Sequence, residues 1–257
     1  MDELIECYGT GDEETANEET ANEETETAQP VIKPVLQTED TGKIFEMAIC
    51  VSYNIPFDGK YKYKQPPESL VNRLKPLTEL FPNCQHTAKK GARYDFTSST
   101  DPTKHLSAKT TKKGGGKVAP QVIGQCQPTK FCETLGIEFT TIPDLKRYIQ
   151  TNATSILPVL VEYTFDCPNL YYNQEKDTIR YITLIQPIDW TSIQVKWTCK
   201  WEEWENSSTM KVVYDETHDL ALIEFQFHTK SRTNMAIRWC YENFLTIFNK
   251  NMHIVHL

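Results

Sequence analysis

An aspartate, a serine and a lysine lie within the stretch "RYDFTSSTDPTKHLSAKTTKKGGGK", which ends at Lys117. Asp95 closes a short apolar run, and Ser107 and Lys109 follow two residues apart. We expect strands at 93–96 and 105–110 that pair as a hairpin, which places Ser107 and Lys109 on one strand face. Mg²⁺ needs a carboxylate ligand, and a lysine can orient a water or balance charge. The spacing therefore predicts chemistry on a phosphodiester.

A basic, glycine-rich loop follows these residues. Residues 41–130 carry 15 Lys or Arg against 6 Asp or Glu, a net charge of +9 inside a chain of net charge −8. Such segregation favours a polyanionic partner. Glycines at 114–116 would let this loop approach a phosphate backbone closely. The candidate DNA contacts are Lys89, Lys90, Arg93, Lys112, Lys113, Lys117 and Gln125.

Residues 1–40 have a different composition. They hold 13 acidic residues against one lysine, and the unit EETAN repeats within them. This composition cannot build a core, so we expect a disordered acidic leader at 1–40 and one folded domain at 41–257. No signal peptide and no membrane span is apparent, which predicts an intracellular, cytoplasmic protein. The eight cysteines form no CxxC pair and are expected to be free thiols.

The patterning predicts a mixture of helices and strands. A helix is expected at 44–53, and another at 66–81 with a kink at Pro76. Helical pieces are expected at 119–126, 128–136 and 142–157. Strands follow from Asn169 onward, and a final amphipathic segment covers 235–249. The fold class is therefore α/β or α+β.

The order of these features resembles the PD-(D/E)XK nucleases typical of type II restriction endonucleases. The resembling features are a helix with Glu46, a helix with Glu79, a strand ending in Asp95 and a strand carrying Lys109. The resemblance implies a restriction-endonuclease-like core, in which helices flank a mixed central β-sheet. It also implies a Mg²⁺ ion held by Asp95, while the sequence shows no Walker loop or GxGxxG motif, so no nucleotide cofactor is expected. The implied activity is cleavage of double-stranded DNA at a short palindrome by a homodimer, leaving 5′-phosphate and 3′-hydroxyl ends.

Ser107 departs from the family pattern, which usually has an acid at this position. The second metal ligand must then come from elsewhere. Four side chains are candidates, namely Glu46, Glu79, Gln121 and Gln125. The other possibility is that Ser107 completes the site with only backbone and water.

Other interpretations compete with this one. Glu224 and Gln226 share a strand face after Asp215 and Asp219, which is a second possible site, or else a polar stripe near DNA or an interface. The tryptophans near 197–204 could stack on bases, or else form core or dimer contacts. His86 could touch phosphate. The hairpin itself could be a lysine-rich surface turn capped by Asp95.

Three other functions stay open at this point. The chain could be a non-catalytic DNA-binding protein that uses the same basic block. It could be a structure-selective repair or recombination nuclease on the same fold. It could also be an interaction protein whose acidic leader and tryptophan-rich strands dock a partner.

Overall fold

The computed structural model describes residues 39–57, 65–88, 92–215, 217–228 and 234–257. All of them belong to one compact unit, Lys33–Leu257. Residues 1–38 of the expected leader, Lys89 and Lys90 lie outside the described residues, and the last two residues of that leader, Glu39 and Asp40, instead begin helix α1. No described helix has the length and apolar character needed to cross a membrane.

The first of two sheets is mixed. Its strands β3 and β6 run parallel, and every other neighbouring pair is antiparallel. The order across the sheet is β1 (Cys84–His86), β2 (Phe96–Ser98), β3 (His105–Thr111), β6 (Asn169–Asn173), β7 (Thr178–Leu184) and β12 (Met252–His256).

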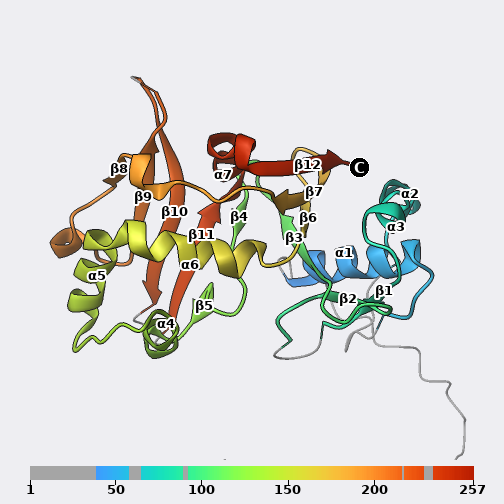
Figure 1. The fold of residues 1–257 in the computed structure, drawn as a ribbon, viewed down its shortest axis with the longest axis horizontal. Coiled ribbons are helices and arrows are strands. Elements are labelled where there is room, and N and C mark those ends of the chain that lie inside the picture. The colour runs from blue at the N-terminus through green and yellow to red at the C-terminus, as the bar shows by residue number, and fades with distance from the viewer. Residues whose placement is uncertain (1–38, 58–64, 89–91, 216, 229–233) are drawn as a thin grey trace, which may run out of the picture. The chain divides into compact units, whose positions relative to one another are not determined.

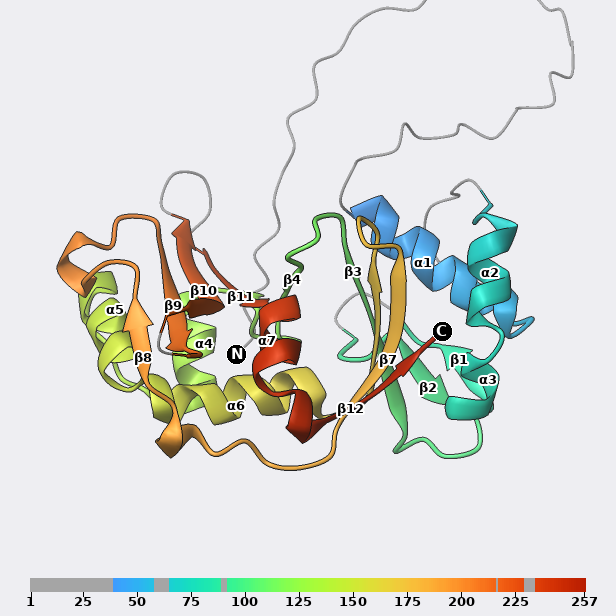
Figure 2. The ribbon, with the colours of Figure 1, turned by 90° about the horizontal axis from the view of Figure 1, so that it is seen from above.

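Three helices share a core with the first sheet: α1 (Glu39–Ser52), α2 (Glu68–Leu74) and α3 (Leu77–Leu80) (Figures 1 and 2). Phe45 and Ile49 of α1 are buried with Leu106 of β3 in one apolar cluster. Helices α2 and α3 separate at Pro76, because proline removes a backbone donor and clashes with the preceding turn. The packing of Phe45 and Ile49 against Leu106 brings α1 close to β3.

The second sheet is antiparallel. Its order is β4 (Lys117–Val118), β11 (Asn234–Cys240), β10 (Asp219–His228), β9 (Ser207–Val213) and β8 (Val195–Trp197), and β5 (Gln125–Cys126) also pairs with β11. One face packs against α4 (Pro128–Leu135), α5 (Ile142–Thr151), α6 (Ala153–Phe165) and α7 (Tyr241–Ile247). Short 3₁₀ helices occupy Trp190–Ser192, Trp201–Glu203 and Asn249–Asn251.

The structure confirms the mixed α+β class and a mixed sheet flanked by helices. It also confirms the helix near 44–53, the strand containing Lys109, and a helix stopped by Gly136, whose φ of 63° suits glycine. The second sheet is an addition that the sequence patterns did not predict.

Several expected elements were wrong. Residues 119–126 form no helix, because their backbone turns and pairs with β11 through β5. The helix at 142–157 is two helices that separate at Asn152. The segment 235–249 begins as strand β11 before α7. The strand at 93–96 starts only at Phe96, so Asp95 precedes β2 instead of ending a strand.

Candidate active site

Asp95 is held against the edge of β3. Strand β2 pairs with β3 only through Phe96–Leu106 and Thr97–His105, so the next residues of β3 have no β2 partner on that edge. Oδ2 of Asp95 takes the place of a backbone acceptor from β2. It accepts hydrogen bonds from the Ala108 backbone N–H at 2.8 Å and from Ser107 Oγ at 3.1 Å. Both hydrogen bonds go to Oδ2, and none is found to Oδ1 among the described residues. The carboxylate is thus fixed, with one oxygen available.

Three charged groups act on one another at this point. Burial raises the pKa of the Asp95 carboxyl above its ordinary value, the nearby Lys109 ammonium opposes that rise, and the Glu46 carboxylate adds to it. Glu46 comes from α1 and Lys109 from β3, so tertiary packing brings both to Asp95. The two carboxylates and the lysine are therefore close enough for their charges to act on one another.

Glu46 is itself held by two partners. It is only 6% exposed, and Lys43, one helical turn earlier, lies 2.8 Å from both of its carboxylate oxygens. His86 of β1 places Nε2 3.2 Å from Oε2 of Glu46. His86 is therefore a buried partner of the Glu46 carboxylate, which favours a structural role over the possible contact with phosphate.

Gln121 also lies near this group of residues. Its amide nitrogen donates to Cys167 Sγ at 3.6 Å, and burial raises the pKa of the Cys167 thiol to about 12, with Lys109 and Asp95 both close enough to affect it. The amide oxygen of Gln121 is buried and has no partner among the described residues. A buried acceptor without a donor is costly, so this oxygen is suited to receive a group from a ligand.

The other predicted ligands lie elsewhere. Glu79 is exposed on α3, and no described contact joins it to Asp95. Gln125 is exposed on β5 of the second sheet. Arg93 pairs with Asp166 at 2.7 Å and lies over the Tyr94 and Tyr163 rings, so part of its charge is already balanced.

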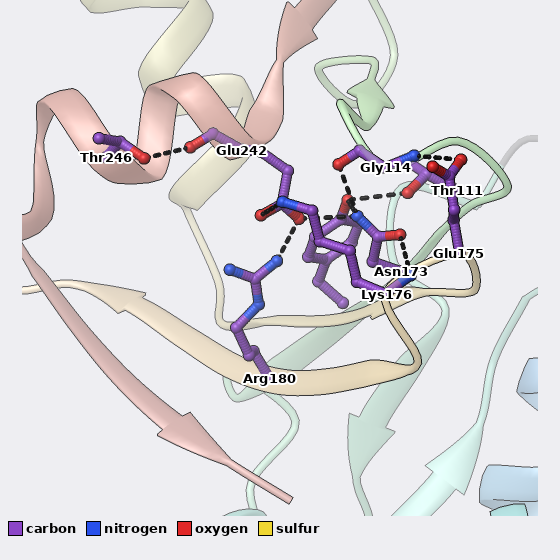
Figure 3. Close-up of polar contacts among 9 residues, drawn as sticks. Thr111, Gly114, Asn173, Glu175, Lys176, Arg180, Glu242 and Thr246 are labelled. Carbon is purple, nitrogen blue, oxygen red and sulfur yellow. Dashed lines mark hydrogen bonds and ion pairs between the residues drawn. The ribbon is translucent and has the colours of Figure 1, made fainter.

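Lysines 112, 113 and 117 are exposed on the segment that joins β3 to β4. A polar network holds the base of this segment to the neighbouring strands (Figure 3). The Gly114 N–H donates to Glu175 at 2.8 Å, and Asn173 donates to the Gly114 carbonyl at 3.0 Å. Asn173 also donates to Glu242 of α7 at 2.9 Å, and Arg180 pairs with the same carboxylate. The loop backbone is anchored while its lysines stay exposed.

Gly116 is the position in this loop where a side chain is excluded. Its φ is +58°, and a Cβ would lie 2.3 Å from the Tyr171 hydroxyl. We expect Gly116→Ala to cost about 1–3 kcal/mol from backbone strain alone, with the clash in addition. The unfolding midpoint in urea should fall. Gly115→Ala is the matched control, since a Cβ there meets nothing within 4 Å. Equal stability of the two variants would contradict this assignment.

The rival site at Glu224 and Gln226 has a different arrangement. Glu224 pairs with Lys117 at 2.8 Å and with Arg238 at 2.9 Å. Asp219 pairs with Lys196 at 3.1 Å, and Asp215 caps a turn at Thr217 and His218. Each of these carboxylates thus has different partners, and no contact among the described residues brings them together.

Two of the three tryptophans of this region, Trp197 and Trp204, pack in or against the core. Trp204 is 2% exposed and contacts the rings of Phe225 and Phe227, and Trp197 packs against Trp204. The core interpretation therefore fits these two side chains better than base stacking.

The residues near Asp95 fit a hard divalent cation. Within the described residues no group of three or more His, Cys, Asp or Glu side chains forms a ready cage. Mg²⁺ is usually held by one or two carboxylates together with water and substrate phosphates, so it needs no such cage. Asp95 Oδ1, the Glu46 carboxylate and the orphaned Gln121 oxygen are all oxygen donors.

The raised pKa of Asp95 gives a stability prediction. Between the ordinary Asp value and the raised pKa, the folded protein binds more protons than the unfolded chain, so stability falls as pH rises through this window. Asp95→Asn removes the buried charge, so at neutral pH in EDTA we expect it to raise Tm. The gain should shrink as pH falls toward 4, near the ordinary Asp pKa. Scanning calorimetry measures both effects.

Asp101 is the matched control, because hydrogen bonds from Thr103 lower its carboxyl pKa instead. Asp101→Asn should not raise Tm at neutral pH. Added Mg²⁺ should stabilise the wild type and leave Asp95→Asn unchanged. A lower Tm for Asp95→Asn in EDTA would mean that its charge is needed for folding.

Three residues that contact candidate residues were missed from the sequence: Lys43, Cys167 and, in the rival region at Glu224, Arg238. Lys43 has a local signal, since it lies three residues before Glu46 and so on the same helical face. Cys167 and Arg238 have none, because their contacts join residues 46 and 14 positions apart, namely Gln121 with Cys167 and Glu224 with Arg238.

Comparison with known proteins gives one relative. The chain is 39% identical over 227 residues to "Type II restriction enzyme CviAII" of Paramecium bursaria Chlorella virus 1. The match takes in 87% of this chain but spans only 64% of the relative's length. No family model matches the chain, and no solved structure matches it.

Proposed function

Since this chain is a homologue of a type II restriction enzyme, we propose that it is an endonuclease that cleaves double-stranded DNA at a short specific sequence. The observation that carries the proposal is the Asp95 carboxylate held at the edge of β3, close enough to Glu46 of α1 and Lys109 of β3 for their charges to act on it, with a loop of three exposed lysines following β3. Carboxylates that hold a cation, beside a lysine and a phosphate-binding loop, suit phosphodiester hydrolysis.

We assign Mg²⁺ as the cofactor, with Asp95 and Glu46 as the carboxylates that would hold it. When bound, the cation polarises the scissile phosphate and lowers the pKa of a water. Gln121 would supply a further neutral oxygen, and Ser107 would hold Asp95 in place through its hydrogen bond. Glu79 lies outside this assignment, because it is exposed on α3.

Lys109 would orient the attacking water and balance the charge that develops on the phosphate oxygens. Lys112, Lys113 and Lys117 would contact the flanking phosphates, with Lys89, Lys90 and Arg93 as further candidates. Affinity for DNA should then fall steeply with salt, because each neutralised phosphate releases counterions. In-line displacement would leave 5′-phosphate and 3′-hydroxyl ends.

A homodimer acting on a palindrome is part of the proposal. Two-fold symmetry in a protein matches two-fold symmetry in its site, and each subunit then cuts one strand. Sedimentation of the full chain with and without a cleaved-site duplex measures the number of subunits bound.

The central test is incubation of the purified full chain with unmethylated plasmid DNA and Mg²⁺. Discrete fragments with common end sequences support the proposal, and DNA that stays intact at every Mg²⁺ and salt concentration contradicts it. The fragment ends, once sequenced, give the recognition site.

A non-catalytic DNA-binding protein is the second candidate, because Asp95 also fills a structural place at the open edge of β3. In that case Asp95→Ala would leave salt-dependent DNA binding unchanged and no preparation would cut DNA. A structure-selective nuclease would cut branched or flapped DNA and leave intact linear duplex uncut.

A further inference from the structure

The second sheet has one face packed in the core and one polar face. The core cluster includes Ile223, Phe225 and Phe227 of β10. It also includes Met235, Ile237 and Trp239 of β11. Because side chains alternate along a strand, the residues between them point to the opposite face. We call this opposite side the outer face.

Antiparallel register arranges the outer face in three rows. Thr209, Glu224 and Arg238 are directly opposite one another on β9, β10 and β11. The next row is Ser207, Gln226, Ala236 and Gln125, and the third is His228 and Asn234. Apart from Ala236, every member carries a hydrogen-bonding side chain. Hydroxyl, carboxylate, guanidinium and amide groups therefore stand side by side on one surface.

The centre of the outer face is held by mutual contacts. Glu224 lies 2.8 Å from the Lys117 ammonium and 2.9 Å from the Arg238 guanidinium, which also donates to Gln226. The Arg238 side chain is still 35% exposed, and its Nε has no partner among the described residues. The Asn234 amide oxygen is likewise without a described partner. Both of these unpaired atoms are buried, and the contacts around Glu224 give the planar groups beside them fixed orientations.

The outer face is joined to the candidate active site by the chain itself. Strand β3 carries Lys109, the basic loop follows it, and the loop ends in β4, which pairs with β11 through Lys117–Cys240 and Val118–Trp239. Lys117 belongs to the loop and also contacts Glu224 of the outer face. A duplex bound by the loop would thus come next to the three rows.

The charge of the outer face is also suited to DNA. In its described part, four basic side chains (Lys117, Lys196, Lys211 and Arg238) stand with two carboxylates (Asp219 and Glu224). A major groove admits a two-stranded β-ribbon and offers donors and acceptors in a pattern unique to each base pair. Arginine suits guanine, glutamine and asparagine suit adenine, and a carboxylate accepts from cytosine.

We propose that the outer face of the second sheet reads base edges in the major groove, with Arg238, Glu224 and Gln226 as residues that determine sequence preference. This assignment rests on the proposed endonuclease function and names the surface that selects its site. The Lys112–Lys117 loop then contacts phosphates, which position the duplex without reading it.

The test is selection of bound sequences. The full chain is mixed with duplexes that carry a randomised ten-base-pair cassette, in Ca²⁺ to permit binding, and the retained pool is sequenced. Wild type should enrich one motif. Arg238→Lys keeps the charge but loses the planar fork, so preference at one base pair of the motif should drop by about 5- to 150-fold. Gln226→Ala should relax a different position, and it serves as the second variant if Arg238→Lys fails to fold.

Lys113→Gln is the matched control, because Lys113 is exposed on the loop. It should weaken binding of every sequence and leave the motif unchanged. Motifs identical to wild type from both Arg238→Lys and Gln226→Ala would overturn the inference, as would a wild type that enriches nothing. Cleavage is measured separately with Mg²⁺. If the wild type enriches a motif but does not cut DNA, the proposed endonuclease function is contradicted, while the assignment of the outer face to base recognition still holds.

Discussion

Lys109→Ala is expected to lower DNA cleavage by about 10³-fold while DNA binding persists. The lysine ammonium offsets the rise in the pKa of Asp95 that burial and Glu46 produce. Its removal raises that pKa further and also takes away the cation that balances charge on the phosphate. Phosphate contacts from the Lys112–Lys117 loop do not depend on it. Single-turnover cleavage of plasmid in Mg²⁺, with affinity measured in Ca²⁺, separates the two effects.

Lys104→Ala is the control for this change. Lys104 is 71% exposed in its side chain, just before β3, and pairs with Asp101 at 3.5 Å. The variant should cut as wild type does. If Lys109→Ala also cuts at the wild-type rate, catalysis does not depend on this lysine, and the β3 edge would have only a structural role.

Glu46→Gln is expected to have the second large effect, a loss of cleavage of about 10²–10³-fold, because a carboxylate that holds a cation contributes several kcal/mol. Glutamine keeps the size and one acceptor for Lys43 and His86, so the fold should survive. Higher Mg²⁺ should restore part of the activity, since the lost negative charge weakens cation binding. A Mg²⁺ titration of cleavage rate, with thermal melting alongside, measures both effects.

Glu79→Gln is the matched control, because Glu79 was an equal candidate in the sequence and is exposed on α3. It should leave the Mg²⁺ dependence unchanged. The opposite result, with Glu79→Gln inactive and Glu46→Gln active, would assign the second carboxylate to α3. If only Gln121→Ala lost cleavage, the second ligand of the cation would be the Gln121 amide.

The sequence was informative where the chemistry depends on local spacing. Ser107 and Lys109 were expected on one strand, two residues apart. Both lie in β3, where they pair with Asn169 and Tyr171 of β6. The helix with Glu46, the strand with Lys109 and the charge segregation all follow from short-range patterns. The boundary at Asp95 was less well predicted, because a three-residue strand such as β2 is defined by pairing with its neighbours more than by its own residues.

The sequence by itself determined the kinds of chemical group present, the mixed α+β class and the basic loop that follows Lys109. Only the tertiary structure decided which acid acts on Asp95, since packing of α1 brings Glu46 close enough to raise the Asp95 pKa, whereas Glu79 is exposed on the four-residue helix α3. It also decided that 119–126 pairs with β11 and that Glu224 meets Arg238. The physical reason is that these contacts join distant segments, and their formation depends on burial and strand pairing that no local pattern encodes.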